Sequence, residues 1–307
     1  MIIYVDKKMM GRVNYPLLKE EFNEVEIVDN LENSSSIDAM VIMNSQLAKI
    51  NIDDYPKLKW IQLLMAGYDN VDVTSIREKG ILISNARDIF SIAIAEDVIS
   101  KILFFNRNTK YYLESMKKKV WQPIQREPEI FNSTIAILGT GSIGKEVAKR
   151  LKSFQVKKIM GYRNKLEEVD GFDEVYNDQE GLMIMCKEAD YLILALPLTE
   201  STKRIIDREK LRLMKKEALI INVARGDILD QDALIEALEN EWIRGAGLDV
   251  TTPEPLPISS KLWTLSNVFI TPHNASSSPY MQDRLYELTR ENLRRFLNNQ
   301  EVKYLLN

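Results

Sequence analysis

The chain contains a single histidine, His273, and the residues upstream of it are of the types that a proton-transfer site needs. It lies in a Thr-Pro-His segment, downstream of Arg225 and of the segment DVTTPEPLP at 249–257, which includes Glu254. Imidazole titrates near neutral pH, so it both donates and accepts protons. The guanidinium fork of arginine grips a carboxylate and polarises the carbonyl beside it. The pattern predicts acid–base chemistry on a small carboxylic acid.

The elements that must position these residues are short strands alternating with helices. Apolar or β-branched runs occur at 2–5, 39–43, 60–64, 81–84, 134–138, 158–161, 191–196, 218–223, 246–250 and 268–271. Helical spacing occurs at 145–153, 231–240 and 279–297, with a Pro-free and Gly-free stretch at 91–119. Alternating βα units predict parallel sheets covered on both faces, whose ligands gather beyond the carboxyl ends of the strands. Taken singly, Arg225, Glu254 and His273 would also fit ordinary turns, but each follows a predicted strand end.

A glycine motif, GTGSIG, lies where the run at 134–138 passes into a helical segment. It satisfies the pattern G-x-G-x-x-G of dinucleotide-binding turns. Gly139 permits the tight turn, Gly141 lets the backbone approach a pyrophosphate, and Gly144 allows close packing of helix and strand. The new helix offers free N–H groups to the anion. The residues that we expect to contact the cofactor here are Gly139, Gly141, Ser142, Ile143 and Gly144.

The residue that we expect to select between NAD(H) and NADP(H) has a positively charged side chain. Chains that bind NAD usually supply Asp or Glu about 20 residues after the motif, to accept hydrogen bonds from the ribose 2′-hydroxyl. Here the next strand ends in Gly-Tyr-Arg-Asn-Lys, with Arg163 and Asn164 at the expected place and Lys165 after them. A carboxylate would repel a 2′-phosphate, whereas a guanidinium binds it bidentately. We expect NADP(H) to be preferred and NAD(H) also to be used. The alternative is that these are exposed loop charges that do not discriminate.

The length of 307 residues favours two domains over one. We expect an α/β fold with a Rossmann-type, doubly wound parallel sheet at 99–275 that binds the dinucleotide. A discontinuous, flavodoxin-like substrate domain is expected at 1–98 and 276–307. The stretch 91–119 would bridge the two, and the helix at 279–297 would pack back on the first domain.

Composition excludes several other classes of partner. The net charge is −4, and basic residues are interspersed with acidic ones, so no footprint for nucleic acid is visible. The one cysteine, Cys186, cannot form an internal disulfide, and no apolar run approaches the length of about 20 residues that spans a membrane. The start lacks the order of a signal peptide, so we expect a cytoplasmic protein. No metal site is predicted.

Ordered motifs along nearly the whole chain resemble the D-isomer-specific 2-hydroxyacid dehydrogenase family, in particular its shorter glyoxylate/hydroxypyruvate reductase-like members. The motifs are LMAGYDNVD (64–72), GILISNA (80–86), ILGTGSIGKEVAKRL (137–151), ALPLTEST (195–202), LIINVARGDILDQDALIEAL (219–238), GAGLDVTTPEPLP (245–257) and FITPHNAS (269–276). The resemblance implies hydride transfer between NAD(P)(H) and C2 of a small 2-oxo or D-2-hydroxy acid. Glyoxylate, hydroxypyruvate and branched 2-oxo acids remain open as substrates.

The resemblance also implies roles for individual residues. His273 would be the acid/base residue, Glu254 the carboxylate that hydrogen-bonds it, and Arg225 the cation that holds the substrate. Backbone N–H groups around Ala66 and Gly67 would receive the substrate carboxylate. Asp249 would lie near the nicotinamide, although an acid at a strand end also commonly caps the next turn. A homodimer is expected from the family, with 91–119 as a contact or as an internal bridge.

Two other functions are compatible with parts of this pattern. Formate dehydrogenase is a relative that has glutamine in place of the acid partner, so Glu254 argues against it. A non-catalytic, NAD(P)-sensing interaction protein on the same scaffold is the alternative from another class, because transcriptional corepressors of this kind retain a similar triad. The absence of long disordered extensions favours the enzyme.

Overall fold

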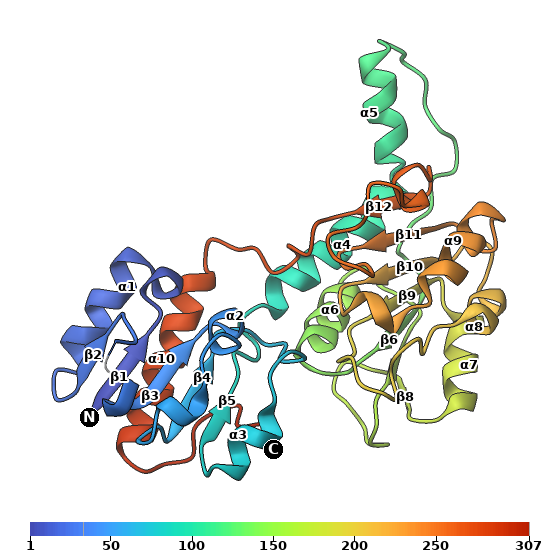
Figure 1. The fold of residues 1–307 in the computed structure, drawn as a ribbon. Coiled ribbons are helices and arrows are strands. Elements are labelled where there is room, and N and C mark those ends of the chain that lie inside the picture. Colours follow the sequence, from blue (N-terminus) through green and yellow to red (C-terminus); the bar gives the residue numbers. More distant parts are fainter. Residues whose placement is uncertain (33, 307) are drawn as a thin grey trace. The chain divides into compact units, whose positions relative to one another are not determined.

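The computed structural model describes residues 1–32 and 34–306, and the chain divides into two compact units (Figure 1). The first unit comprises Met1–Phe90 and Ser278–Asn307, and the second comprises Ser91–Ser277. Each unit is built on one parallel sheet with flanking helices, so the predicted α/β fold class is confirmed. Within the described ranges, no helix is long and apolar enough to cross a membrane.

The strands of the first unit are parallel and lie in the order β2-β1-β3-β4-β5. Their bounds are β1 (Ile2–Val5), β2 (Glu26–Val28), β3 (Ile37–Ile42), β4 (Trp60–Leu63) and β5 (Leu82–Ser84). The helices of this unit are α1 (Lys7–Glu21), α2 (Asn44–Leu47), α3 (Val73–Glu78) and α10 (Met281–Leu297). This strand order is that of the flavodoxin-like fold. The first unit therefore has the predicted topology.

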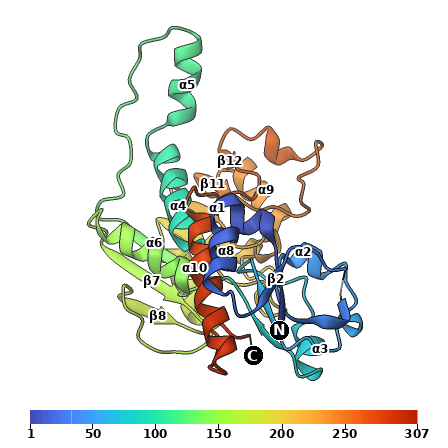
Figure 2. The ribbon, with the colours of Figure 1, turned by 90° about the vertical axis from the view of Figure 1, so that its left-hand side faces the viewer.

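Helix α10, from the end of the chain, packs on the first unit as the sequence predicts. The ring of Phe296 lies against Trp60 of β4, with 5.1 Å between the ring centroids. Glu21 at the end of α1 pairs with Arg290 at 2.8 Å and with Arg294. Helices α1 and α10 lie side by side in both views (Figures 1 and 2). The C-terminal segment thus completes the core of the N-terminal sheet.

The strands of the second unit are also parallel, in the order β12-β11-β10-β9-β6-β7-β8. Their bounds are β6 (Thr134–Leu138), β7 (Lys158–Tyr162), β8 (Glu174–Tyr176), β9 (Tyr191–Leu194), β10 (Leu219–Asn222), β11 (Gly245–Leu248) and β12 (Val268–Ile270). The helices are α4 (Ser91–Asn106), α5 (Thr109–Lys117), α6 (Ser142–Lys152), α7 (Gln179–Glu188), α8 (Arg208–Leu213) and α9 (Gln231–Glu239). The order reverses between β6 and β9, and such a switch point is where open α/β sheets bind ligands.

Helices cover both faces of this second sheet. Ala136 and Leu138 of β6 belong to an apolar cluster that includes side chains of α7, α8 and α9. Ile137 faces the opposite side, where a Cβ on Gly144 of α6 would lie 3.3 Å from its Cγ2 atom. Helix α4 packs beside α6 on that side. The alternation along one strand explains the doubly wound arrangement, because a strand buried on both faces needs an apolar partner on each.

The prediction of one helix over 91–119 is wrong. Helix α4 ends at Asn106 and α5 begins at Thr109, and Asn108 between them has a φ of 46°. Asparagine tolerates this left-handed conformation better than most residues. Glu127 stabilises the break, because it accepts a hydrogen bond from Asn108 at 3.3 Å and pairs with Arg107 at 2.7 Å. As a result α5 extends away from the sheet of its own unit (Figures 1 and 2).

Buried Asn292 of α10 generates a stability prediction for the first unit. Its amide group donates to Gln62 Oε1 at 2.6 Å and accepts from the backbone N–H of Lys303 at 2.7 Å. Asn292→Ala removes both hydrogen bonds and leaves the backbone N–H of Lys303 without its acceptor, so we expect it to lower the free energy of unfolding by about 3 kcal/mol. Asn298→Ala, at the exposed C-cap of the same helix, should change it by less than about 1 kcal/mol. Urea unfolding checks both values, and equal losses would contradict this account.

Candidate active site

In the turn after β6, close contacts with the backbone require glycine at two positions. Gly139 has a φ of 105°, and a Cβ there would lie 2.5 Å from the carbonyl oxygen of Ala195. A Cβ on Gly144 would lie 2.0 Å from the carbonyl oxygen of Gly139. Both positions therefore require glycine for the turn to form and for α6 to pack on it.

Gly141 is different, because apart from its own stretch of backbone no atom of the described residues lies within 4 Å of the place where its Cβ would be. It is the N-cap of α6, and no side chain caps this helix end. The first N–H groups of α6, starting at Ser142 and Ile143, therefore lack the usual capping partner. Free helical N–H groups beside open space fit the pyrophosphate of a dinucleotide.

The basic segment predicted to select the cofactor follows β7. The backbone N–H of Arg163 donates to the carbonyl of Tyr176 at 3.0 Å, which fixes the start of the segment against β8. The guanidinium of Arg163 forms an ion pair with Glu167. Asn164 and Lys165 are exposed. The structure thus places a cation at the strand end, as the sequence indicates, and adds a carboxylate beside it.

His273 and Glu254 are brought together by the structure. The Nδ1 atom of His273 lies 2.8 Å from Oε2 of Glu254, and the two side chains are 48% and 39% exposed. The other carboxylate oxygen of Glu254 accepts the backbone N–H of Thr251 at 3.1 Å. A carboxylate accepts only, so Nδ1 carries the proton of this hydrogen bond. The contact therefore assigns the Nδ1 atom of His273 to Glu254.

The loop that carries His273 is held by Asp249, which follows β11 and is 3% exposed. Its carboxylate accepts from the hydroxyl of Thr271 at 2.6 Å and from the backbone N–H of Asn274 at 3.0 Å. The backbone N–H of His273 donates to the carbonyl of Asp249 at 2.8 Å. Asp249 therefore caps the loop after β12. Its predicted contact with the nicotinamide stays a prediction.

A buried ion pair contacts this loop, and the sequence patterns did not predict it. Fully buried Lys101 of α4 pairs with Asp97 and donates to the hydroxyl of Thr271 at 2.9 Å. Burial raises the pKa of Asp97, the pairing with Lys101 works against that rise, and Asp249 adds to it. The available signal was an Asp and a Lys four residues apart in an otherwise apolar part of a helix.

Arg225 lies between β10 and the turn that follows. Asn222 donates to the carbonyl of Arg225 at 2.9 Å and accepts the N–H of Ala224 at 3.0 Å, which fixes the backbone of this segment. A Cβ on Gly226 would lie 2.2 Å from the carbonyl oxygen of Thr251. The Arg225 segment therefore packs directly on the segment that leads to Glu254. Because β10, β11 and β12 are neighbours, Arg225, Glu254 and His273 all follow the carboxyl ends of adjacent strands.

The predicted substrate-binding residues Ala66 and Gly67 belong to the first unit, after β4. Asn85 donates to the carbonyl of Ala66 at 2.7 Å, and Asn44 donates to the carbonyl of Gly67 at 2.8 Å. Both carbonyls are thereby held in place by amide side chains. Their role toward a substrate stays a prediction.

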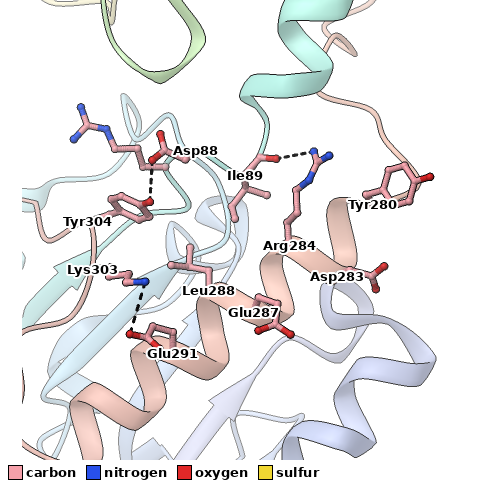
Figure 3. A pocket seen from close by; sticks show the side chains of 11 residues that line it. Asp88, Ile89, Tyr280, Asp283, Arg284, Glu287, Leu288, Glu291, Lys303 and Tyr304 are labelled. Carbon is pink, nitrogen blue, oxygen red and sulfur yellow. Dashed lines mark hydrogen bonds and ion pairs between the residues drawn. The ribbon is translucent and has the colours of Figure 1, made fainter. Parts of the chain in front are cut away.

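A hollow in the first unit contains none of the predicted site residues (Figure 3). Some of its polar side chains are engaged with one another or with the backbone. Tyr304 donates to Asp88 at 2.8 Å, and Arg284 donates to the carbonyl of Ile89 at 3.2 Å. Among the described residues, no cluster of His, Cys, Asp and Glu has the arrangement of a metal site.

Comparisons with known proteins agree with this geometry. Residues 99–275 match the protein family described as D-isomer specific 2-hydroxyacid dehydrogenase, NAD binding domain. A glyoxylate reductase of Pyrococcus horikoshii is 33% identical over 313 residues, which cover 96% of this chain and 92% of that protein.

Two solved structures are similar over almost their full length. A D-isomer specific 2-hydroxyacid dehydrogenase family protein from Aeromonas salmonicida subsp. salmonicida has a TM-score of 0.87 and 28% identity, covering 100% of this chain and 98% of that chain. An NADPH-dependent glyoxylate/hydroxypyruvate reductase from Sinorhizobium meliloti, in complex with NADP and malonate, has a TM-score of 0.78 and 26% identity. That match covers 99% of this chain and 96% of the other.

The glycine turn generates a paired prediction about folding and cofactor binding. Gly144→Ala should lower the free energy of unfolding by about 2 kcal/mol or more, because its Cβ meets backbone. Gly141→Ala should fold with near-native stability, since its φ of −75° suits any residue, yet bind NADPH about tenfold more weakly. Urea unfolding and fluorescence titration with NADPH measure the two effects. If Gly141→Ala binds NADPH with native affinity, the pyrophosphate does not bind at this turn.

Proposed function

Because the chain belongs to the D-isomer specific 2-hydroxyacid dehydrogenase family, we propose that it reduces C2 of a small 2-oxo acid, with NADPH as the preferred donor. It is an NAD(P)-dependent oxidoreductase. The observation that carries the proposal is the 2.8 Å contact between His273 Nδ1 and Glu254, beyond the carboxyl end of the sheet and next to the Arg225 segment. The product is a D-2-hydroxy acid, as in the family name.

His273 is the proton donor in this proposal. Hydride addition to C2 builds negative charge on the carbonyl oxygen, which takes a proton from Nε2 of the imidazolium. Glu254 holds the ring through Nδ1 and so fixes the direction in which Nε2 points. In the oxidative direction the same nitrogen accepts the proton from the hydroxyl group.

Arg225 and the segment around Ala66 and Gly67 bind the substrate. The guanidinium holds the carboxylate and polarises the adjacent carbonyl, so the developing negative charge faces a fixed positive one. The backbone N–H groups of Ala66 and Gly67 receive the substrate carboxylate. Support for this comes from the two asparagines that fix the carbonyls of these residues.

The cofactor is held by the glycine turn and by the segment after β7. Its nicotinamide, when bound, supplies the hydride. The N–H groups after Gly141 bind the pyrophosphate, and Arg163 and Asn164 lie beside the adenosine 2′-position. Asp249 borders the nicotinamide end. NADPH is preferred and NADH is accepted, and the NADPH-dependent reductase of Sinorhizobium meliloti supports this order.

We also propose that the protein forms a homodimer through α5 and the segment after it. Large apolar side chains are exposed there on a part of the chain that extends from its own sheet: Tyr111, Leu113, Met116, Val120 and Trp121. Trp121 is 100% exposed. Clustered exposed apolar groups of this kind mark protein interfaces, and a closed symmetric dimer is the commonest way to cover them.

A substrate panel tests the catalytic proposal. NADPH and NADH oxidation should be measured with glyoxylate, hydroxypyruvate, pyruvate and branched 2-oxo acids. His273→Ala and Arg225→Ala should each lower kcat by about a hundredfold or more, while NADPH binding stays near native. Arg208→Ala, at an exposed ion pair on α8, is the matched control and should retain native turnover. Tight NADPH binding without turnover on any acid would instead support a cofactor sensor.

The homodimer is tested by its mass in solution. Met116→Asp combined with Trp121→Asp should convert the dimer to a monomer, because charged side chains resist burial in an apolar interface. Ile258→Asp introduces the same charge at a position that is 98% exposed outside this segment and should leave the dimer intact. Light scattering at several protein concentrations gives the result. A native protein that is monomeric, or a dimer that survives the double substitution, would rule out this interface.

A further inference from the structure

The segment between β7 and β8 joins two opposite charge patterns. It opens with the basic group Arg163, Asn164 and Lys165, which we propose to lie at the adenosine 2′-position. The rest of the connection and the start of β8 are strongly acidic, with Glu167, Glu168, Asp170, Asp173 and Glu174. A 2′-phosphate would therefore bind to a cation that lies at the edge of a negatively charged loop.

The structure pairs the key cation with the first of these acids. The guanidinium of Arg163 contacts the carboxylate of Glu167, with side chains 28% and 55% exposed. The donors that would grip a phosphate are therefore shared with an internal carboxylate. This acid does not lie directly at the end of β7, because Glu167 comes four residues after Arg163.

The loop that carries Glu167 is anchored by the residues that follow it. A Cβ on Gly161 would lie 2.8 Å from the ring of Phe172, so the loop returns tightly onto β7. The carboxylate of Asp173 accepts the backbone N–H of Ile159 at 2.7 Å. Val169 is buried beneath the loop. These contacts keep Glu167 within reach of Arg163.

We infer that Glu167 is a specificity-determining residue, which competes with the 2′-phosphate of NADPH for Arg163. This inference rests on the proposed role of Arg163. At neutral pH a phosphate monoester carries nearly two negative charges, so it is repelled by Glu167 as well as deprived of donors by it. The neutral 2′-hydroxyl of NADH needs no guanidinium and is indifferent to the pair. Glu167 therefore narrows the preference for NADPH over NADH.

The expected size of the effect follows from the exposure of the pair. Half-exposed ion pairs are worth little, so releasing Arg163 should improve binding by about two- to fivefold. The gain should appear only for ligands with a 2′-phosphate. It should shrink at high salt, because salt screens both the repulsion and the attraction.

The test compares Glu167→Gln with Glu168→Gln in the full-length protein. Both substitutions remove one negative charge from adjacent exposed positions, but only the first removes the partner of Arg163. Calorimetry at low ionic strength measures the binding of adenosine 2′,5′-bisphosphate, with 5′-AMP as the ligand that lacks the 2′-phosphate. Glu167→Gln should bind the bisphosphate about two- to fivefold more tightly than Glu168→Gln does. The two variants should bind 5′-AMP equally, and kcat/KM for NADPH over NADH should rise in parallel.

Arg163→Ala and the double variant Arg163→Ala/Glu167→Gln complete the cycle. If Glu167 acts mainly through Arg163, its substitution has a smaller effect once the arginine is gone, because only the direct repulsion of the 2′-phosphate is then relieved. Weaker bisphosphate binding in Arg163→Ala together with equal binding by Glu167→Gln and Glu168→Gln would overturn the inference and leave the cofactor proposal intact. Unchanged bisphosphate binding in Arg163→Ala would overturn the proposed NADPH preference itself, and the role of Glu167 with it.

Discussion

The buried carboxylate of Asp249 is the interaction on which the arrangement of the site depends. It follows β11 and accepts from Thr271 and from the N–H groups of Asn274 and Ala275, all in the loop after β12. A carboxylate with several N–H and O–H donors is stabilised without a solvent shell. Asp249 thus joins two neighbouring strand ends. His273, in the left-handed conformation with a φ of 51°, takes its place within that loop.

The hydrogen bonds of Asp249 are connected to a buried ammonium group, that of Lys101. Lys101 and Asp97 form a pair on α4, and Lys101 also donates to the hydroxyl that Thr271 offers to Asp249. Removing one member of such a network leaves a buried charge without its partner, which costs several kcal/mol. The network therefore couples the inner face of α4 to the loop of His273. Local strand geometry alone would not define that loop, because it contains a proline and a residue with positive φ.

Much of the fold could be predicted from residue patterns, and the failures have identifiable causes. The run at 134–138 coincides with β6, because a fully buried strand is continuously apolar. Strands β2 and β8 were missed, since each has three residues and lies at a sheet edge, where one polar or charged side chain hides the pattern. The helix break at Asn108 was missed because no proline or glycine marks it. Such a break depends on Glu127, whose contact the linear sequence does not display.

The site could be predicted as a set of residue types, but its electrostatic detail could not. Motif order predicts that Arg225, Glu254 and His273 follow strand ends, and the sheet order then makes those ends neighbours. By contrast, the partner of Arg163 depends on how the loop after β7 folds back, with Phe172 against Gly161 of β7 and Val169 buried. Spacing rules for ion pairs hold on helices, whereas 163–167 is a loop. The contact between Arg163 and Glu167 is therefore one that only the folded loop reveals.

The partial exposure of His273 and Glu254 indicates that their contact orients the imidazole ring and adds little stability. An ion pair with side chains 48% and 39% exposed adds little to the free energy of unfolding. Each partner is nevertheless fixed independently by the backbone, Glu254 through the N–H of Thr251 and His273 through the carbonyl of Asp249. The fold thus fixes the geometry of this contact, although the contact itself adds little to the free energy of unfolding. Such a constraint is expected where an imidazole must present one nitrogen in a defined direction while remaining open to solvent and substrate.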